Sequence, residues 1–245
     1  MSKQTDLINI PDAITVSGSN VGIGETVPLG KLHVKTADSG ATVDVGADEL
    51  VIEGSGNAGM SILSGASNTG SIYFGDSGTN WDGYIAYSQN SRSMTFGTAA
   101  GGGSMTLDSS GRVTTPNQPS FLARNATGFN SSSTIMKGFQ TIQHNIGGHF
   151  NNSTGYFTAP VAGKYLVNAG VLISGYTGRL EFSVEVNSGS PYINGNGTGT
   201  DFDGPTASAV FNLSANDTIR VRLGSGTPYA GGNHPNTYFG VTSLG

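Results

Sequence analysis

Between residues 20 and 115 the chain repeats one simple pattern, in which a short run of alternating apolar residues is followed by a turn rich in glycine. Each run offers two or three apolar side chains, such as Ile72 with Phe74, or Met105 with Leu107. Alternation with a period of two is typical of β-strands. So few apolar side chains per strand cannot form the core of a monomeric domain, so we expect these strands to be buried against other copies of the chain.

Composition supports a nearly all-β chain. Only 11% of the residues are charged, glycine occurs 39 times, and no amphipathic helix of three turns is evident. The net charge is −5 and the 11 Lys and Arg residues are scattered singly, so we expect no nucleic-acid partner. Cysteine is absent, which excludes disulfides and thiolate chemistry. The N-terminus has no apolar leader segment, and we expect neither secretion nor membrane insertion.

The glycines of NVGIGETVPLGKLHV (residues 20–34) do not form a phosphate-binding loop. Such a loop needs glycine five positions before the Gly-Lys pair and Ser or Thr after it, but Glu25 and Leu32 stand there. The following residues alternate as a strand does. We therefore interpret these glycines as tight turns beside closely packed neighbouring backbones.

Several ordered motifs in residues 19–113 resemble the shaft repeats of bacteriophage tail fibres and related adhesins. They comprise a Val-Gly-Ile-Gly turn with a Lys-Leu-Xxx-Val strand, followed by SIYFGD, GYIAYSQ, SMTFGT and SMTLDSSG. The resemblance implies a fibrous, intertwined β-rich shaft. The segment TTPNQPS then carries two prolines that disfavour regular structure, so residues 116–120 are interpreted as a linker.

After the linker the strands are longer. Leu180, Phe182, Val184 and Val186 alternate with polar residues, as do Ile219, Val221 and Leu223, and this pattern predicts an antiparallel sheet with one buried face.

This C-terminal region also resembles the globular head of complement component 1q and the wider tumour-necrosis-factor-like jelly rolls. The family signature of spaced aromatic, Asn, Phe, Gly and Tyr positions is met in full, by Phe139, Asn145, Phe150, Phe157, Gly163 and Tyr165. The resemblance implies a trimer of ten-stranded jelly rolls, with these residues as structural signature positions and the aromatic ones in the core. Val167 and Ala169 replace two aromatics that usually follow the Tyr, so the interior layer is thinner or is filled from elsewhere.

Catalytic and metal-binding patterns are poor throughout. Neither a Gly-Xxx-Ser-Xxx-Gly elbow nor a zinc-binding His-Glu-Xxx-Xxx-His helix occurs. Glu181 and Glu185 are roughly 13 Å apart if they share a strand, too far for retaining glycosidase chemistry. Asp201 and Asp203 are roughly 7 Å apart, but no apolar environment is evident to raise one pKa, and as calcium ligands the pair is incomplete. His144 and His149 could meet symmetry copies at a metal, but solvated or hydrogen-bonded roles are commoner. We expect no enzyme activity, no cofactor and no metal.

Two long loops rich in Gly, Asn, Asp and Tyr are the candidate binding sites, at residues 187–206 and 224–237. Aromatic faces with amide and carboxylate acceptors suit sugar rings, although glycine-rich loops can also merely connect strands. The candidate receptor-binding residues are Tyr176, Arg179, Tyr192, Asp201, Asp203, Tyr229, Asn233 and His234.

The sequence therefore favours an all-β homotrimeric bacteriophage fibre. We expect a virion attachment segment at residues 1–20 that contacts tail or baseplate proteins, a shaft at 21–115, a linker at 116–120 and a jelly-roll head at 121–245. The head would bind a glycan or protein of the host cell surface by multivalent contacts, after synthesis in the bacterial cytoplasm and assembly into the virion. The alternatives are a purely structural collar, decoration or head fibre with the jelly roll as a trimerisation clamp, a polysaccharide-degrading spike, and a bacterial adhesin built from the same modules.

Overall fold

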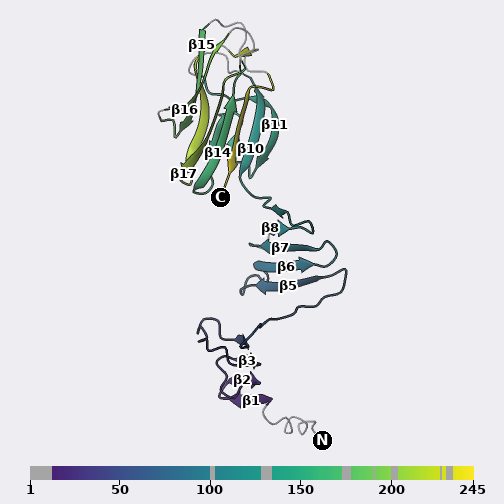
Figure 1. Ribbon diagram of the computed structural model, residues 1–245. Helices are drawn as coiled ribbons and strands as arrows, with labels where there is room; N and C mark the ends of the chain where they lie inside the picture. Colours follow the sequence, from purple (N-terminus) through teal and green to yellow (C-terminus); the bar gives the residue numbers. More distant parts are fainter. Residues whose placement is uncertain are drawn as a thin grey trace. The chain divides into compact units, whose positions relative to one another are not determined.

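The computed structural model describes residues 13–99, 103–127, 134–172, 178–189, 191–199, 204–226, 228–229 and 234–245. Every element assigned in these ranges is a β-strand, which confirms the all-β prediction (Figure 1). The described ranges contain no helix long and apolar enough to cross a membrane. The chain divides into two compact units, residues 1–71 with 88–90, and residues 72–87 with 91–245. The predicted linker at 116–120 lies within the second unit.

A four-stranded sheet lies in the first unit. Its strands are β1 (Ile14–Ser17), β2 (Asn20–Ile23), β3 (Leu32–Lys35) and β4 (Leu50–Glu53), in that order. β1 and β2 form an antiparallel hairpin, whereas β2, β3 and β4 run parallel. The glycine turn after β2 therefore lies between paired strands. A Cβ on Gly22 would be 2.1 Å from the carbonyl oxygen of Glu25, so only glycine fits there.

A second sheet contains five strands in sequential order. They are β5 (Thr69–Phe74), β6 (Gly83–Ser88), β7 (Ser93–Gly97), β8 (Gly103–Leu107) and β9 (Val113–Thr114). β7 and β8 pair antiparallel with Met94 opposite Leu107 and Phe96 opposite Met105. Directly opposite residues share a face, so these four side chains lie on one side of the sheet.

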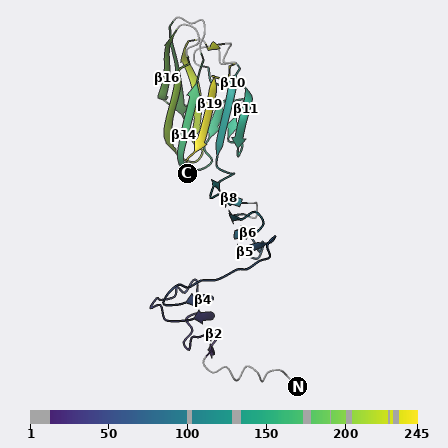
Figure 2. The ribbon, with the colours of Figure 1, turned by 45° about the vertical axis from the view of Figure 1, so that its right-hand side comes forward.

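Residues 120–243 form a sandwich of two five-stranded sheets (Figure 2). The first has the order β11-β10-β19-β14-β17 and the second the order β12-β13-β18-β15-β16. The strands of the first are β10 (Ser120–Ala126), β11 (Phe139–Ile146), β14 (Gly163–Gly170), β17 (Thr206–Leu213) and β19 (Tyr238–Ser243). Those of the second are β12 (Phe150–Asn151), β13 (Tyr156–Thr158), β15 (Gly178–Val186), β16 (Pro191–Gly199) and β18 (Thr218–Ser225).

Aromatic rings fill the space between these two sheets. Phe121 stacks on Phe150 with ring centroids 4.1 Å apart and meets Phe239 edge to face at 4.9 Å. Phe157 and the fully buried Tyr165 extend the cluster. Such pairs stabilise a core beyond their area burial.

The interior layer beside Val167 and Ala169 is filled from a neighbouring strand. Both residues are fully buried on β14, and Phe239 of β19 lies directly opposite Ala169. A small residue opposite a phenyl ring conserves the volume of the layer, so the missing aromatic at position 169 is compensated by Phe239.

The second sheet of the sandwich has buried residues on both faces, whereas the alternating pattern predicts only one buried face. Leu180, Phe182, Val184 and Val186 are buried as the pattern predicts, but Ser183, Glu185 and Arg220 on the opposite face are buried too. Arg220 Nε donates to Glu185 Oε2 at 2.6 Å, Arg222 Nε lies 3.0 Å from Glu185 Oε1, and Arg220 also bonds the Tyr156 hydroxyl. Alternation reveals which residues share a face but not which neighbours cover it.

Candidate functional site

The candidate loops of the sandwich gather mainly at one end of it. β14, β16 and β18 end there, and β15, β17 and β19 begin there, as the antiparallel registers require. In Figure 1 this is the end opposite the chain's C-terminus. Arg179 stands near the start of β15, where its backbone pairs with that of Thr198. We call this end the loop end.

Tyr229 and His234 lie together at the loop end. Their ring centroids are 5.6 Å apart in an edge-to-face arrangement. His234 Nδ1 accepts a hydrogen bond from the Asn236 backbone N–H at 3.2 Å, so in the neutral ring Nε2 carries the hydrogen. An aromatic face and an imidazole donor are suitable groups for recognising a polar ligand with an apolar surface.

Two buried residues that the sequence did not single out hold this pair. The Leu172 carbonyl accepts from the Tyr229 backbone N–H at 2.8 Å, and the Leu172 N–H donates to Thr237 Oγ1 at 3.3 Å. The Thr237 N–H in turn donates to the His234 carbonyl at 2.9 Å. Thr237 is fully buried. The backbones of Tyr229 and His234 are therefore both hydrogen-bonded to buried residues of the sandwich. A threonine beside a glycine-rich loop gives no sequence signal for this role.

Tyr192 does not lie beside Tyr229 and His234. Its neighbour Ile193 pairs with Val184, five residues along β15 from Arg179, which corresponds to roughly 17 Å of strand. The hairpin of β15 and β16 thus places Tyr192 toward the opposite end of the sandwich from Arg179. The segment 187–206, which is predicted above as one loop, contains strand β16 at Pro191–Gly199.

Four further candidates, Tyr176, Asp201, Asp203 and Asn233, lie outside the described residues.

A shallow depression adjoins the turn that carries His234. It has a volume of about 330 Å³ and is lined by Leu122, Arg124, Pro235, Asn236 and Tyr238. Arg124 Nε is shielded from solvent and has no hydrogen-bond partner among the described residues. A buried N–H without an acceptor is costly, so this group is poised to bind an acceptor from another molecule.

The signature position Asn145 has a structural role. Its Nδ2 donates to the Phe150 carbonyl at 2.9 Å, and its Oδ1 accepts from the Phe150 N–H at 3.1 Å. The amide thus closes the turn between β11 and β12. Phe139, Phe150 and Phe157 are buried, while Gly163 begins β14, where a Cβ would be 3.2 Å from the Gly245 carbonyl oxygen.

The histidines of this turn do not gather metal ligands in the described part of the chain. His144 Nε2 lies 2.9 Å from Ser120 Oγ, and the His149 ring meets the edge of Phe157. A third histidine, His33, gathers with Glu25 and Glu53 in the first sheet, with ligand atoms within 4.8 Å of one another. Lys35 Nζ already lies 2.6 Å from Glu25 and 3.6 Å from Glu53, so a protein cation balances these carboxylates.

Glu185, one of the carboxylates considered for glycan cleavage, is ion-paired with Arg220 and Arg222 in the buried cluster described above. Both of its carboxylate oxygens are therefore engaged within the sandwich. Asp201 and Asp203 lie outside the described residues.

The comparison with protein families gives one match. Residues 120–241 match the model of the C1q domain. Residues 120–241 of this chain form a C1q-like jelly-roll domain. The expected head is therefore confirmed in its fold, and no enzyme family is indicated.

The comparison with solved structures lists the globular domain of zebrafish complement 1qA, with 22% identity, 51% of this chain and 92% of that chain covered, and a TM-score of 0.37. Murine APRIL at pH 5.0 has 16% identity, with 52% and 99% covered and a TM-score of 0.42. Eiger TNF from S. frugiperda has 13% identity, with 53% and 94% covered and a TM-score of 0.43. The comparison with curated proteins gave no match.

Proposed function

We propose that this chain is a homotrimeric bacteriophage fibre protein, with a C1q/TNF-like head that binds the host cell surface and performs no chemistry. The proposal of a trimer rests on the sheet of the first unit, whose apolar face is exposed to solvent. Its apolar face consists of two rows, Ile14–Ile23–Val34–Ile52 and Val16–Val21–Leu32–Leu50, each aligned across all four strands.

This apolar face is uncovered in the single chain. Val16 is 72% exposed and Leu50 is 50% exposed, whereas His33 and Glu53 on the opposite face are buried. Each half-exposed aliphatic side chain leaves on the order of 1 kcal/mol of burial unrealised. Copies of the same face meeting around an axis would supply that burial, as the shaft resemblance implies.

The head offers a second surface suited to assembly. The outward face of its first sheet carries four incompletely buried aliphatic residues, Leu122, Ile146, Leu166 and Val210. On the same face, Arg124 Nε has no acceptor in the part of the chain that the structure describes. The C1q and TNF resemblance implies a trimer, in which a neighbouring copy would cover this face.

In such a fibre the loop end would contact the host. Tyr229 and His234 would bind the receptor, and three sites on each head would add by multivalency. The phage role rests on the ordered shaft motifs, and the binding role on the anchored loop end.

Light scattering on a sizing column tests this proposal. The intact chain and a fragment of residues 119–245 should each have the mass of three copies. A monomeric intact chain would contradict it, and a monomeric fragment beside a trimeric intact chain would assign assembly to the shaft alone.

A further inference from the structure

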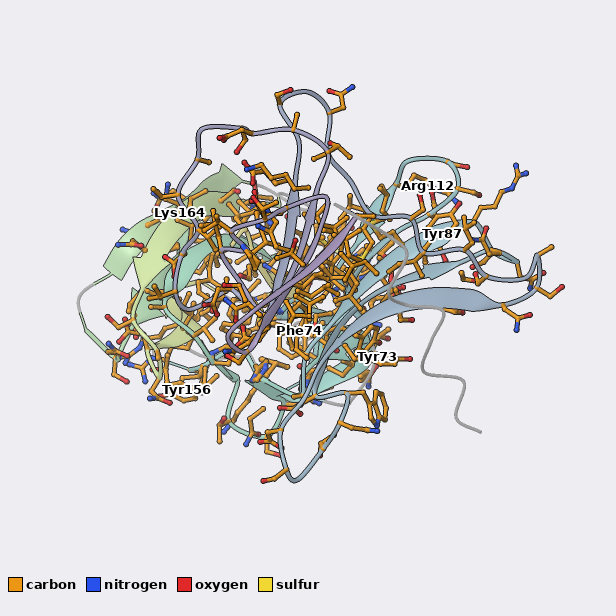
Figure 3. The ribbon with its side chains drawn as sticks, turned by 90° about the horizontal axis from the view of Figure 1, so that it is seen from below. Tyr73, Phe74, Tyr87, Arg112, Tyr156 and Lys164 are labelled. Atoms are coloured by element: carbon orange, nitrogen blue, oxygen red, sulfur yellow. The ribbon has the colours of Figure 1, made fainter. Side chains whose placement is uncertain are left out.

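Three aromatic side chains gather on one face of the sheet β5–β9. The rings of Tyr73 and Tyr84 have centroids 6.5 Å apart and meet edge to face, and Trp81 lies 6.4 Å from Tyr84 at a tilt of 40°. Neighbouring strand residues point to opposite faces, so Tyr73 and Phe74 lie on opposite faces of the sheet. Both residues are labelled in Figure 3. The aromatic trio is therefore separate from the apolar side that carries Phe74.

The backbone around the trio is fixed by close contacts. A Cβ on Gly97 would be 2.2 Å from the Tyr84 ring, so this ring lies directly on the glycine backbone of β7. The turn before Trp81 is held by Asp76, whose Oδ1 accepts from the N–H groups of Gly78 at 2.7 Å and Thr79 at 3.0 Å. Gly75 packs on the backbone of Asn80, where a Cβ would be 2.5 Å away. A ligand would therefore meet a preorganised surface.

The trio is exposed but too small for a protein partner. Tyr73 is 60% exposed and Trp81 is 44% exposed. Half-exposed aromatic rings of this number offer roughly 300 to 400 Å². A specific protein interface needs about 600 Å² or more from each partner. The trio matches a ligand of one or two rings.

The charges near the trio disfavour an anionic ligand. Residues 69–91 contain no Lys or Arg, while Asp76 and Asp82 are both exposed. The turn also supplies hydroxyl and amide groups from Ser77, Thr79 and Asn80. Apolar ring faces beside uncharged hydrogen-bonding groups suit a sugar, which has an apolar face and a rim of hydroxyls.

We propose that Tyr73, Trp81 and Tyr84 form a binding platform for neutral oligosaccharides of hexose or N-acetylhexosamine units. This site goes beyond the proposed function of the head, because it uses other residues in another sheet. In an assembled fibre it would add weak contacts to a host glycan along the shaft.

Trp81 is the only tryptophan of the chain, so its fluorescence reports on this site alone. Maltohexaose and N-acetylchitohexaose would be titrated into the full-length protein up to about 10 mM, ten times a millimolar dissociation constant. At least one of them should give a saturable change, whereas a hyaluronan hexasaccharide should give none. Absence of a saturable change with both neutral probes, or equal affinity for hyaluronan, would overturn the proposal.

Tyr73→Thr keeps the reporter and removes one ring. It should weaken binding about tenfold, the equivalent of about 1.4 kcal/mol. Arg112→Ser, at an exposed side chain in the turn between β8 and β9, should bind as the wild type does. Unchanged affinity in Tyr73→Thr would show that the trio is not the site. Saturation-transfer NMR on the wild-type protein decides the matter if the variant misfolds, since aromatic rings should saturate the sugar ring protons.

Discussion

His33 illustrates how single polar residues stabilise the first sheet. It is fully buried, and its Nδ1 accepts from the Leu29 N–H at 3.2 Å, which leaves the hydrogen of the neutral ring on Nε2. Nε2 lies 2.9 Å from Glu53 Oε2. Glu53 Oε1 accepts from the backbone N–H and the hydroxyl of Ser39. Nothing in the sequence around His33 distinguishes it from a solvent-exposed histidine. In the structure it belongs to a polar network that joins β3 to β4 and to Ser39, in the segment after β3.

The pH dependence of stability should report this network. The Ser39 N–H, with the Ser39 hydroxyl and the positive charge of Lys35, lowers the pKa of Glu53 from 4.5 to about 2. Because the folded pKa is the lower one, the stability from Glu53 is complete above pH 4.5 and is lost as the pH falls toward 2.

Thermal unfolding followed by circular dichroism at pH 7 and pH 3 measures the effect. Glu53→Gln should show a smaller drop in midpoint between the two pH values than the wild type. Glu49→Gln, at an exposed position, should keep the wild-type difference. An equal drop in the wild type and Glu53→Gln would contradict the assignment.

A second prediction for a single residue concerns the side chain of Asn145. Asn145→Ala removes both hydrogen bonds to Phe150 and should destabilise the head by about 2 kcal/mol, at about 1 kcal/mol for each bond. Denaturant unfolding of the head gives the value. Asn151→Ala serves as the comparison because Asn151 Oδ1 bonds only its own turn, so a larger loss there would refute the special role of Asn145.

At the scale of strands, pairing decides where small residues are required. Gly195 on β16 lies directly opposite Phe182 on β15, and a Cβ at this position would be 2.1 Å from the fully buried phenyl ring. Glycine at position 195 is therefore required by the packing of the neighbouring strand, in a segment that is predicted from the sequence as a loop.

Gly195→Ala should consequently overpack this pair. The expected loss is about 1 to 3 kcal/mol in the free energy of unfolding of the head. The double variant Gly195→Ala with Phe182→Leu should recover part of the loss, which would establish the contact by coupling. Full additivity of the two substitutions would exclude it.

At the scale of the whole molecule, we expect assembly through two exposed surfaces. These are the apolar face of the sheet β1–β4 and the outward face of the head's first sheet. Val16→Asp with Leu50→Asp places a charge at each end of one apolar row of the first sheet. Buried unpaired carboxylates are strongly destabilising, so the variant should lose the trimeric mass of the shaft in light scattering. Thr26→Asp with Asn57→Asp, at exposed positions outside the two rows, is the control and should keep it.

Host recognition is tested separately at the loop end. Tyr229→Thr should reduce adsorption to host cells about tenfold or more, because three weak sites multiply on one head. Particle yield and the trimeric mass should not change. Normal adsorption of intact particles carrying this substitution would favour the purely structural virion protein instead.

The strand character of the chain and the buried faces of the longer strands could be predicted from the sequence, because they follow from local periodicity. The jelly-roll head was predicted from the resemblance of positions such as Phe157 and Tyr165 to a family signature. Contacts between strands became evident only in the folded chain. The tertiary structure separated Tyr192 from Arg179, buried Glu185 against Arg220, and aligned Val16 with Leu50 across four strands. Each of these depends on the register between strands distant in sequence, because pairing, and not alternation, fixes which side chains meet.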